Sequence, residues 1–196
     1  LPGIVRRDKD GPADGMIPVG FSSWTRGVSG RIRLPGLIHP HEVMSARGPC
    51  RILRDALADG TLTRGASRTP ALRALRGLAG VFAAFPADLG VWGSAAMELA
   101  TGRPYTHDES DLDILVEPRG AAGAMEVAGW LRAILDAEAE FGLRIDAELR
   151  LDNGRGVSLK ELMGEGKTVL GKGELDVTLL DKNTVFDSLS NDNHNR

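Results

Sequence analysis

The chain has 196 residues, of which 42% are hydrophobic and 26% charged, with 25 glycines and 10 prolines; this composition is typical of a globular protein and argues against a disordered, collagen-like or coiled-coil chain. The single cysteine, Cys50, excludes an intrachain disulfide framework, and no apolar run reaches the roughly 20 residues that cross a bilayer. Because no apolar segment of signal-peptide length follows the first arginines, we expect a cytoplasmic protein that does not bind membranes.

The net charge of −3 is the sum of two opposite parts. Residues 1–80 contain 13 basic and 6 acidic side chains, a net charge of +7, whereas residues 81–196 contain 11 basic and 21 acidic side chains, a net charge of −10. A basic part beside an acidic part is consistent with an anion-binding module joined to a metal-binding one. It is equally consistent with surface charge that has no function. The motifs are needed to distinguish these two interpretations of the charge distribution.

The first part of the chain predicts strands followed by helices. Residues 1–50 are rich in Gly and Pro and contain only short apolar pieces, which favours short strands joined by turns. Residues 50–59 predict a helix that stops at a glycine. A second helix is expected over residues 70–85, with Thr69 as its N-cap and Pro70 at its first position.

The pattern then changes to strand, helix and strand. Residues 89–92 are short and apolar and predict a strand, and residues 94–101 predict a helix that ends before a glycine. In residues 110–117 apolar and acidic side chains alternate, which predicts a strand. This strand places Asp111 and Asp113 on one face, because side chains two apart in a strand point the same way.

A long helix and a second alternating strand follow. The helix is expected over residues 121–141, and its apolar side is predicted to consist of Met125, Ala128, Leu131 and Leu135. The strand is expected over residues 143–151, with Asp146 and Glu148 on its polar face.

Shorter elements complete the chain. Ser158 and Glu161 have the spacing of a capping box at the start of a short helix, and residues 168–170 and 177–180 predict two further strands. Helices and strands of this number and order predict an α+β fold.

Two motifs carry chemistry. Gly93 and Ser94 open a predicted helix, where free backbone N–H groups, a hydroxyl and the helix dipole favour an anion such as phosphate. Asp111 and Asp113 offer carboxylate oxygens, which Mg²⁺ prefers together with substrate phosphate oxygens. Each motif alone is weak, because a Gly-Ser pair is commonly just a helix cap and an Asp-x-Asp strand is commonly a solvated face. Their order along the chain favours metal-dependent phosphoryl chemistry.

A third carboxylate on the neighbouring strand, Asp146 or Glu148, would allow two ions to sit about 3.5–4 Å apart and to assist an in-line displacement. We favour Asp146 because it lies earlier on its strand. The arrangement resembles the nucleotidyltransferase superfamily of DNA polymerase β, whose pattern is Gly-Ser on a strand-helix turn, an Asp-x-Asp strand and an acidic residue on the next strand.

A narrower resemblance covers nearly the whole chain. The segments WGSAAMELATGRPYTHDESDLDILVEP, RIDAELRLDNGRGVSLKEL and IVRRDKDGPADGMIPVG resemble the phosphoribosyl-dephospho-CoA transferases of the malonate decarboxylase system. The resemblance implies a polymerase-β-like nucleotidyltransferase domain over residues 81–196, with a mixed sheet flanked by helices. It also implies a small N-terminal domain of mixed structure, which the basic residues 1–80 would form.

The resemblance implies a reaction of the EC 2.7.7 class that depends on Mg²⁺. The prosthetic group of 2′-(5″-triphosphoribosyl)-3′-dephospho-CoA is transferred to a serine of the apo acyl-carrier subunit, and pyrophosphate leaves. Asp111, Asp113 and Asp146 are expected to bind Mg²⁺, Gly93 and Ser94 to hold the pyrophosphate, and Asp146 or Glu148 to take the proton of the serine. Further candidates for substrate binding are Arg103, Tyr105, and Lys167 and Lys172 in a glycine-rich segment that predicts a flexible basic loop.

Two alternatives remain open from the sequence. The same Gly-Ser and Asp-x-Asp parts serve enzymes that transfer an adenylyl group to a small molecule or to a protein hydroxyl, so the motifs do not separate these reactions. The basic part also invites a nucleic-acid-binding function. We do not expect a nucleic-acid partner, because aromatic residues are only 5% of the chain and do not alternate with basic ones.

Overall fold

The structure is a computed structural model, and it describes residues 2–6, 15–27, 30–174 and 176–191. Residues 7–14, which belong to the N-terminal segment quoted for the family resemblance, lie outside the described residues.

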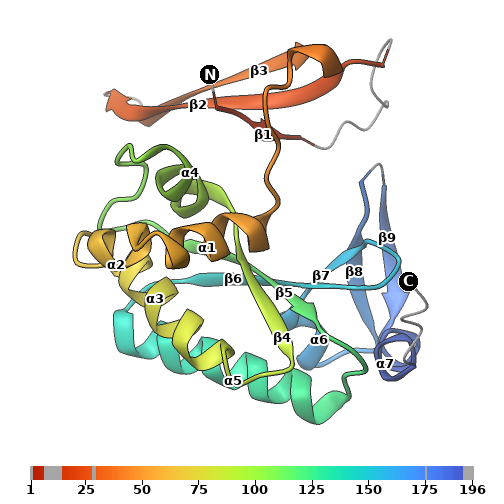
Figure 1. Ribbon diagram of the computed structural model, residues 1–196. Coiled ribbons are helices and arrows are strands. Elements are labelled where there is room, and N and C mark those ends of the chain that lie inside the picture. The colour runs from red at the N-terminus through yellow and green to blue at the C-terminus, as the bar shows by residue number, and fades with distance from the viewer. Residues whose placement is uncertain (1, 7–14, 28–29, 175, 192–196) are drawn as a thin grey trace.

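A small antiparallel sheet forms the N-terminal part of the molecule (Figure 1). Its strands are β1 (Ile4–Val5), β2 (Ile17–Gly27) and β3 (Gly30–Ile38), in the order β1-β2-β3. The expected strands are confirmed, although β2 and β3, with 11 and 9 residues, are longer than the short apolar pieces suggested. A single 3₁₀ turn, η2 (Pro40–Glu42), follows β3.

The rest of the chain builds one mixed sheet with helices around it (Figure 1). Its strands are β4 (Ala87–Val91), β5 (Leu112–Pro118), β6 (Ile145–Arg150), β7 (Gly156–Ser158), β8 (Thr168–Lys172) and β9 (Val177–Asp181). The helices are α1 (Pro49–Ala58), α2 (Thr61–Gly65), α3 (Pro70–Phe82), α4 (Gly93–Thr101), α5 (Ala124–Phe141), α6 (Leu159–Met163) and α7 (Lys182–Ser190). The strands lie in sequence order, and β5 and β6 are parallel while the other neighbours are antiparallel. The predicted α+β fold is confirmed.

Local signals begin two helices where the sequence predicts them. The Thr69 hydroxyl accepts a hydrogen bond from the Leu72 backbone N–H at 3.4 Å, and Pro70 is the first residue of α3. The Ser158 hydroxyl accepts from the Glu161 N–H at 3.3 Å at the start of α6. Each bond satisfies an N–H group that has no partner inside its helix.

One buried core unites the six-stranded sheet with the helices that pack against it. It extends from Leu53 in α1 to Leu189 in α7, and α3 contributes its whole apolar side. Helix α1 packs on β4 and α3 packs on α5. The domain boundary at residue 80 stays a prediction, but α1, α2 and α3 share this core, which favours a boundary ahead of Pro49.

The predicted apolar side of α5 is wrong. Met125 is 83% exposed and Leu135 is 42% exposed, and the residues that α5 buries are Val127, Trp130, Ile134 and Ala137. Both sets have helical spacing, and the set that contains the large indole of Trp130 faces the core because it removes more apolar surface from water.

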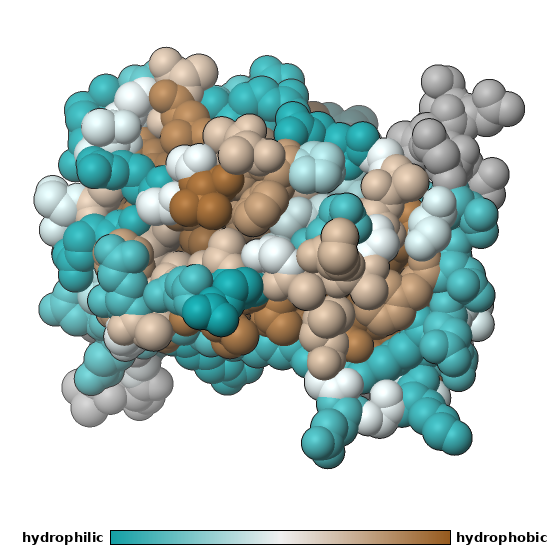
Figure 2. All heavy atoms as spheres, turned by 90° about the horizontal axis from the view of Figure 1, so that it is seen from below, coloured by the Kyte–Doolittle hydropathy of each residue, from teal (hydrophilic) through white to brown (hydrophobic). Residues whose placement is uncertain are grey.

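Figure 2 shows the face that lies at the bottom of Figure 1; hydrophobic residues run through its middle and hydrophilic residues surround them.

Within the described part of the chain, no helix combines the length and the apolar character needed to cross a membrane.

Candidate active site

The Gly-Ser motif and the Asp-x-Asp motif meet at the end of β4. Helix α4 begins at Gly93, whose φ of +59° lies in the left-handed region that favours glycine. A Cβ atom on Gly93 would lie 2.3 Å from Asp113 Oδ2, so no other residue allows the carboxylate this position without a shift. The Trp92 backbone N–H also donates to the Asp113 carbonyl at 2.9 Å. The glycine thus has a second role, which the sequence did not indicate: it makes room for Asp113.

Acidic side chains gather around Asp113. In the parallel pair of β5 and β6, Asp113 lies opposite Asp146, while Glu148 lies opposite Leu115, two positions further along. Burial raises the pKa of Asp113 above its ordinary value, and the negative charges of Asp146, Asp111 and Glu148 raise it further. The site therefore concentrates negative charge, as a cation site does.

Both alternatives for the third carboxylate are paired with a cation. Arg144 Nε lies 2.9 Å from Asp146 Oδ1, and its NH2 group lies 2.7 Å from Oδ2. Lys172 Nζ donates to Glu148 Oε1 at 2.5 Å. The Arg144 side chain is 69% exposed, and an exposed ion pair of this kind contributes little stability, so Asp146 can change partners at low cost.

The donor set fits Mg²⁺ that arrives with a phosphate ligand. No group of three or more His, Cys, Asp or Glu side chains among the described residues forms a closed metal site. Mg²⁺ does not require one, because it is commonly held by one or two carboxylates, water and substrate phosphate oxygens. Asp111 is exposed just ahead of β5 and Asp113 is half-buried, so both are open to such an ion.

A cavity with a volume of about 600 Å³ lies between the N-terminal sheet and the first turn of α4. Gly93, Ser94 and Tyr105 line it, together with residues from all three N-terminal strands. No side chain caps the N–H groups at the start of α4. These groups therefore face the cavity without a side-chain partner. The position of the Gly-Ser pair agrees with the predicted phosphate role, which stays a prediction.

The two candidates from the loop after α4 differ in their surroundings. Tyr105 is only 4% exposed, and its hydroxyl donates to the Ser22 carbonyl at 3.1 Å. The Arg103 guanidinium lies 5.5 Å from the centre of the Trp24 ring. Both side chains therefore connect the loop to β2, and Tyr105 also borders the cavity.

The expectation of one flexible loop that carries both lysines is wrong. Strand β8 separates them: Lys172 is its last residue, beside Glu148, whereas Lys167 precedes its first residue. Five strand residues span roughly 16 Å of backbone, so the two lysines do not belong to one loop, and their roles in substrate binding stay predictions. The Lys167 carbonyl accepts from the Lys182 N–H at 2.9 Å, near the start of α7.

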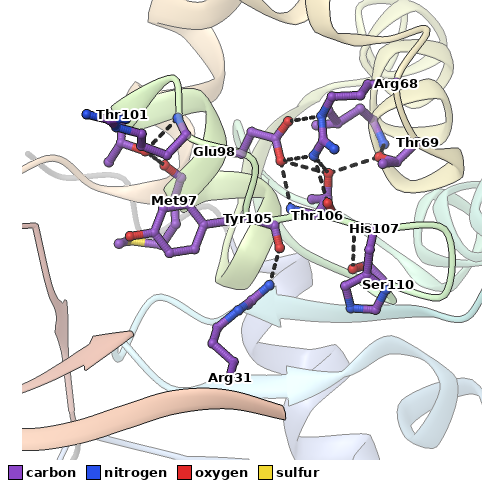
Figure 3. Close-up of polar contacts among 12 residues, drawn as sticks. Arg31, Arg68, Thr69, Met97, Glu98, Thr101, Tyr105, Thr106, His107 and Ser110 are labelled. Carbon is purple, nitrogen blue, oxygen red and sulfur yellow. Dashed lines mark hydrogen bonds and ion pairs between the residues drawn. The ribbon is translucent and has the colours of Figure 1, made fainter. Parts of the chain in front are cut away.

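A polar network around the buried Glu98 supports the loop between α4 and β5, and sequence reasoning missed it (Figure 3). Glu98, buried on α4, forms an ion pair with Arg68 and accepts hydrogen bonds from the Thr106 N–H at 2.7 Å and the Thr106 hydroxyl at 2.8 Å. Arg68 also donates to the Thr106 carbonyl at 2.7 Å. A Glu in the middle of a helix usually faces solvent, so its residue type does not predict burial. The only sign in the sequence that Glu98 is buried is its position on the apolar side of α4.

Comparisons with known proteins identify the family. Residues 56–183 match the family described as "Phosphoribosyl-dephospho-CoA transferase MdcG C-terminal domain". A phosphoribosyl-dephospho-CoA transferase of Xanthomonas axonopodis pv. citri is 36% identical over 121 residues, which are 62% of this chain and 54% of the relative. One of Xanthomonas euvesicatoria pv. vesicatoria is 30% identical over 188 residues, 95% of this chain and 81% of the relative.

No solved structure matches the chain. The chain spans about half the length of the first of these relatives and most of the second. The family match covers helices α2 and α3 and the entire six-stranded sheet, and thus the whole site around Asp113. The chain belongs to the phosphoribosyl-dephospho-CoA transferase family.

Proposed function

We propose that the chain transfers the phosphoribosyl-dephospho-CoA group from 2′-(5″-triphosphoribosyl)-3′-dephospho-CoA to a serine of the apo acyl-carrier subunit of malonate decarboxylase. It acts as a polymerase-β-like nucleotidyltransferase of the EC 2.7.7 class. The observation that carries the proposal is the contact of Gly93 with the Asp113 carboxylate, which brings the phosphate motif and the acidic motif into one site of a chain from this family.

The reaction replaces a phosphoanhydride bond of the triphosphate with a phosphoester bond to serine. The serine oxygen forms a bond to the α-phosphorus of the triphosphate, and the bond between that phosphorus and the bridging oxygen to the β-phosphate breaks. Pyrophosphate leaves, the serine proton passes to a carboxylate, and a phosphodiester remains. Such transfers depend on positioning and on neutralisation of the phosphate charge more than on covalent chemistry by the protein.

Each residue of the site has a task in this proposal. The N–H groups at Gly93 and the Ser94 hydroxyl hold the departing pyrophosphate. Asp111 and Asp113 would hold Mg²⁺, which when bound would neutralise charge on the triphosphate. Asp146, in register with Asp113 and paired with the exposed Arg144, would be the third carboxylate to hold the ion.

Glu148 is then the carboxylate that remains for the serine proton. It lies on the same strand face as Asp146, two positions further along, and Lys172 holds it in place. Lys172 therefore acts on Glu148 in this proposal, in place of the direct substrate contact that the sequence suggested.

A thermal-shift experiment separates this function from adenylyl transfer. We expect dephospho-CoA with Mg²⁺ to raise the melting temperature, because a ligand that binds the native state stabilises it. ATP with Mg²⁺ serves as the comparison. Stabilisation by ATP without any effect of dephospho-CoA would favour adenylyl transfer and contradict the proposal.

A further inference from the structure

The charged side chains that line the cavity beside α4 are all positive, and they lie beside apolar side chains such as Phe21, Leu34 and Met97. Three arginines line it, Arg6, Arg31 and Arg33, and none of the described residues in its wall is acidic. The described carboxylates form ten ion pairs elsewhere, and none of these involves Arg6 or Arg33. Guanidinium groups gathered in this way repel one another, and a polyanion between them relieves the repulsion.

The N-terminal sheet holds these arginines at the cavity. Arg31 and Arg33 are two apart on β3 and thus point to the same face. Arg6 follows β1 and crosses Gly20 of β2: a Cβ atom on Gly20 would lie 3.0 Å from Arg6 Cδ. Glycine at this position lets the Arg6 side chain lie flat against the sheet.

Contacts of Arg31 and Tyr105 help to fix the sheet to the catalytic part of the chain. Arg31 donates to the Tyr105 carbonyl, and its guanidinium lies 5.5 Å from the centre of the Tyr105 ring (Figure 3). The Tyr105 hydroxyl in turn donates to the Ser22 carbonyl on β2. Arg31 therefore serves mainly to position the sheet, and Arg6 and Arg33 remain as the groups available to a ligand.

The opposite wall of the cavity consists of Gly93 and Ser94 at the start of α4. An anion there meets helix N–H groups on one side and guanidinium groups on the other. We propose that the N-terminal sheet supplies Arg6 and Arg33 as the second half of a polyphosphate site, in which they bind the triphosphate that the proposed reaction splits. The inference deepens the proposed function and rests on it for the identity of the ligand.

Tripolyphosphate is the probe that tests the site without any reaction. Its binding to the 196-residue chain is measured by calorimetry, for the unchanged chain and for the double variant Arg6→Gln/Arg33→Gln. We expect the double variant to bind at least about tenfold more weakly, because two charge-assisted contacts are lost. Arg76→Gln removes one positive charge from the exposed side of α3 and should leave binding unchanged.

Dephospho-CoA, which carries a diphosphate but no triphosphate, is the second probe. Weaker binding of dephospho-CoA with unchanged binding of tripolyphosphate would assign the arginines to the CoA diphosphate and overturn the inference. Equal tripolyphosphate binding by all variants would also overturn it. Arg33→Lys keeps the charge and should recover part of the affinity, which separates a loss of contact from a loss of fold.

The inference and the proposed function fail in different ways. If the chain loads the carrier and the arginine variants still bind tripolyphosphate normally, only the inference is wrong. If the chain does not load the carrier but binds tripolyphosphate through Arg6 and Arg33, the polyphosphate site stands and the proposed function is wrong.

Discussion

Asp113 is the carboxylate at which the two motifs of the site meet. Its side chain touches Gly93 and lies opposite Asp146, and its pKa is raised by burial and by three neighbouring carboxylates. A carboxyl group with a raised pKa in the folded state stabilises the fold at low pH, and this contribution is lost as the pH rises through the raised pKa. At neutral pH without metal, the charge of Asp113 therefore opposes folding.

The variant Asp113→Asn keeps the shape of the side chain and removes its charge. We expect its melting temperature at pH 7.5 without metal to rise by about 2–4 °C, the change that ~1 kcal/mol produces in a chain of this size. The gain should shrink as the pH falls toward the ordinary pKa of an aspartate. Mg²⁺ should stabilise the unchanged chain and leave the variant unaffected.

Asp187→Asn, on the exposed side of α7, is the control for Asp113→Asn. A variant less stable than the unchanged chain would contradict the electrostatic account of the site.

The reactivity of Cys50 provides a pH-dependent test of the packing between α1 and the sheet. Burial raises the pKa of its thiol to about 12, and a hydrogen bond to Glu117 at 3.0 Å together with the negative charges of Glu117 and Asp88 adds to the shift. Since only the thiolate reacts, alkylation by iodoacetamide at pH 9 should be about five-hundredfold slower than in the unfolded chain.

Intact-mass measurements follow this reaction over time. Glu117→Gln should speed it, because the variant removes a negative charge next to the sulfur, while Glu140→Gln on the exposed side of α5 should not. Rapid alkylation of the folded, unchanged chain at pH 9 would show that Cys50 is not held as a thiol.

At the scale of the elements, the loop between α4 and β5 decides where the acidic motif lies. Glu98 binds Arg68 and the loop residue Thr106, and the loop leads directly to Asp111 (Figure 3). Glu98 and Thr106 are buried, although the Arg68 side chain is 39% exposed, so the loss of the Glu98 charge weakens hydrogen bonds of Thr106 in a region that largely excludes water.

We therefore expect Glu98→Gln to lower the free energy of unfolding by about 1–3 kcal/mol, as measured by urea denaturation. Glu140→Gln, an exposed change of the same kind, should stay within about 0.5 kcal/mol of the unchanged chain. If the two variants were equally stable, the network would not support the loop.

The sequence predicted elements well where a local signal was strong. Thr69 and Pro70 defined the start of α3, because a cap and a first-turn proline act through their immediate neighbours. The buried side of α5 depended on the packing of Trp130 against distant residues, and helical spacing alone did not select it. Helix α7 was missed, although its cap is visible in the sequence: the Asp181 carboxylate accepts from the Asn183 N–H at 2.9 Å.

At the scale of the whole molecule, the uneven distribution of charge corresponds to two sides of one site. The carboxylates around Asp113 come from the acidic part of the chain, and Arg6 and Arg33 come from the basic part. The sequence indicated both groups of charged residues but not that they lie at one site. Their proximity depends on contacts such as that of Tyr105 with Ser22, which are 83 residues apart in the chain. No pattern of local spacing contains that information.

The central claim is tested most directly by the mass of the carrier subunit. The apo acyl-carrier subunit of malonate decarboxylase is incubated with the chain, the triphosphoribosyl precursor and Mg²⁺, and its intact mass is measured. The account predicts a gain of one phosphoribosyl-dephospho-CoA group on a serine, with release of pyrophosphate, and almost no gain with Asp113→Ala or with EDTA. An unchanged carrier mass with the unaltered chain, or equal loading by Asp113→Ala, would contradict it.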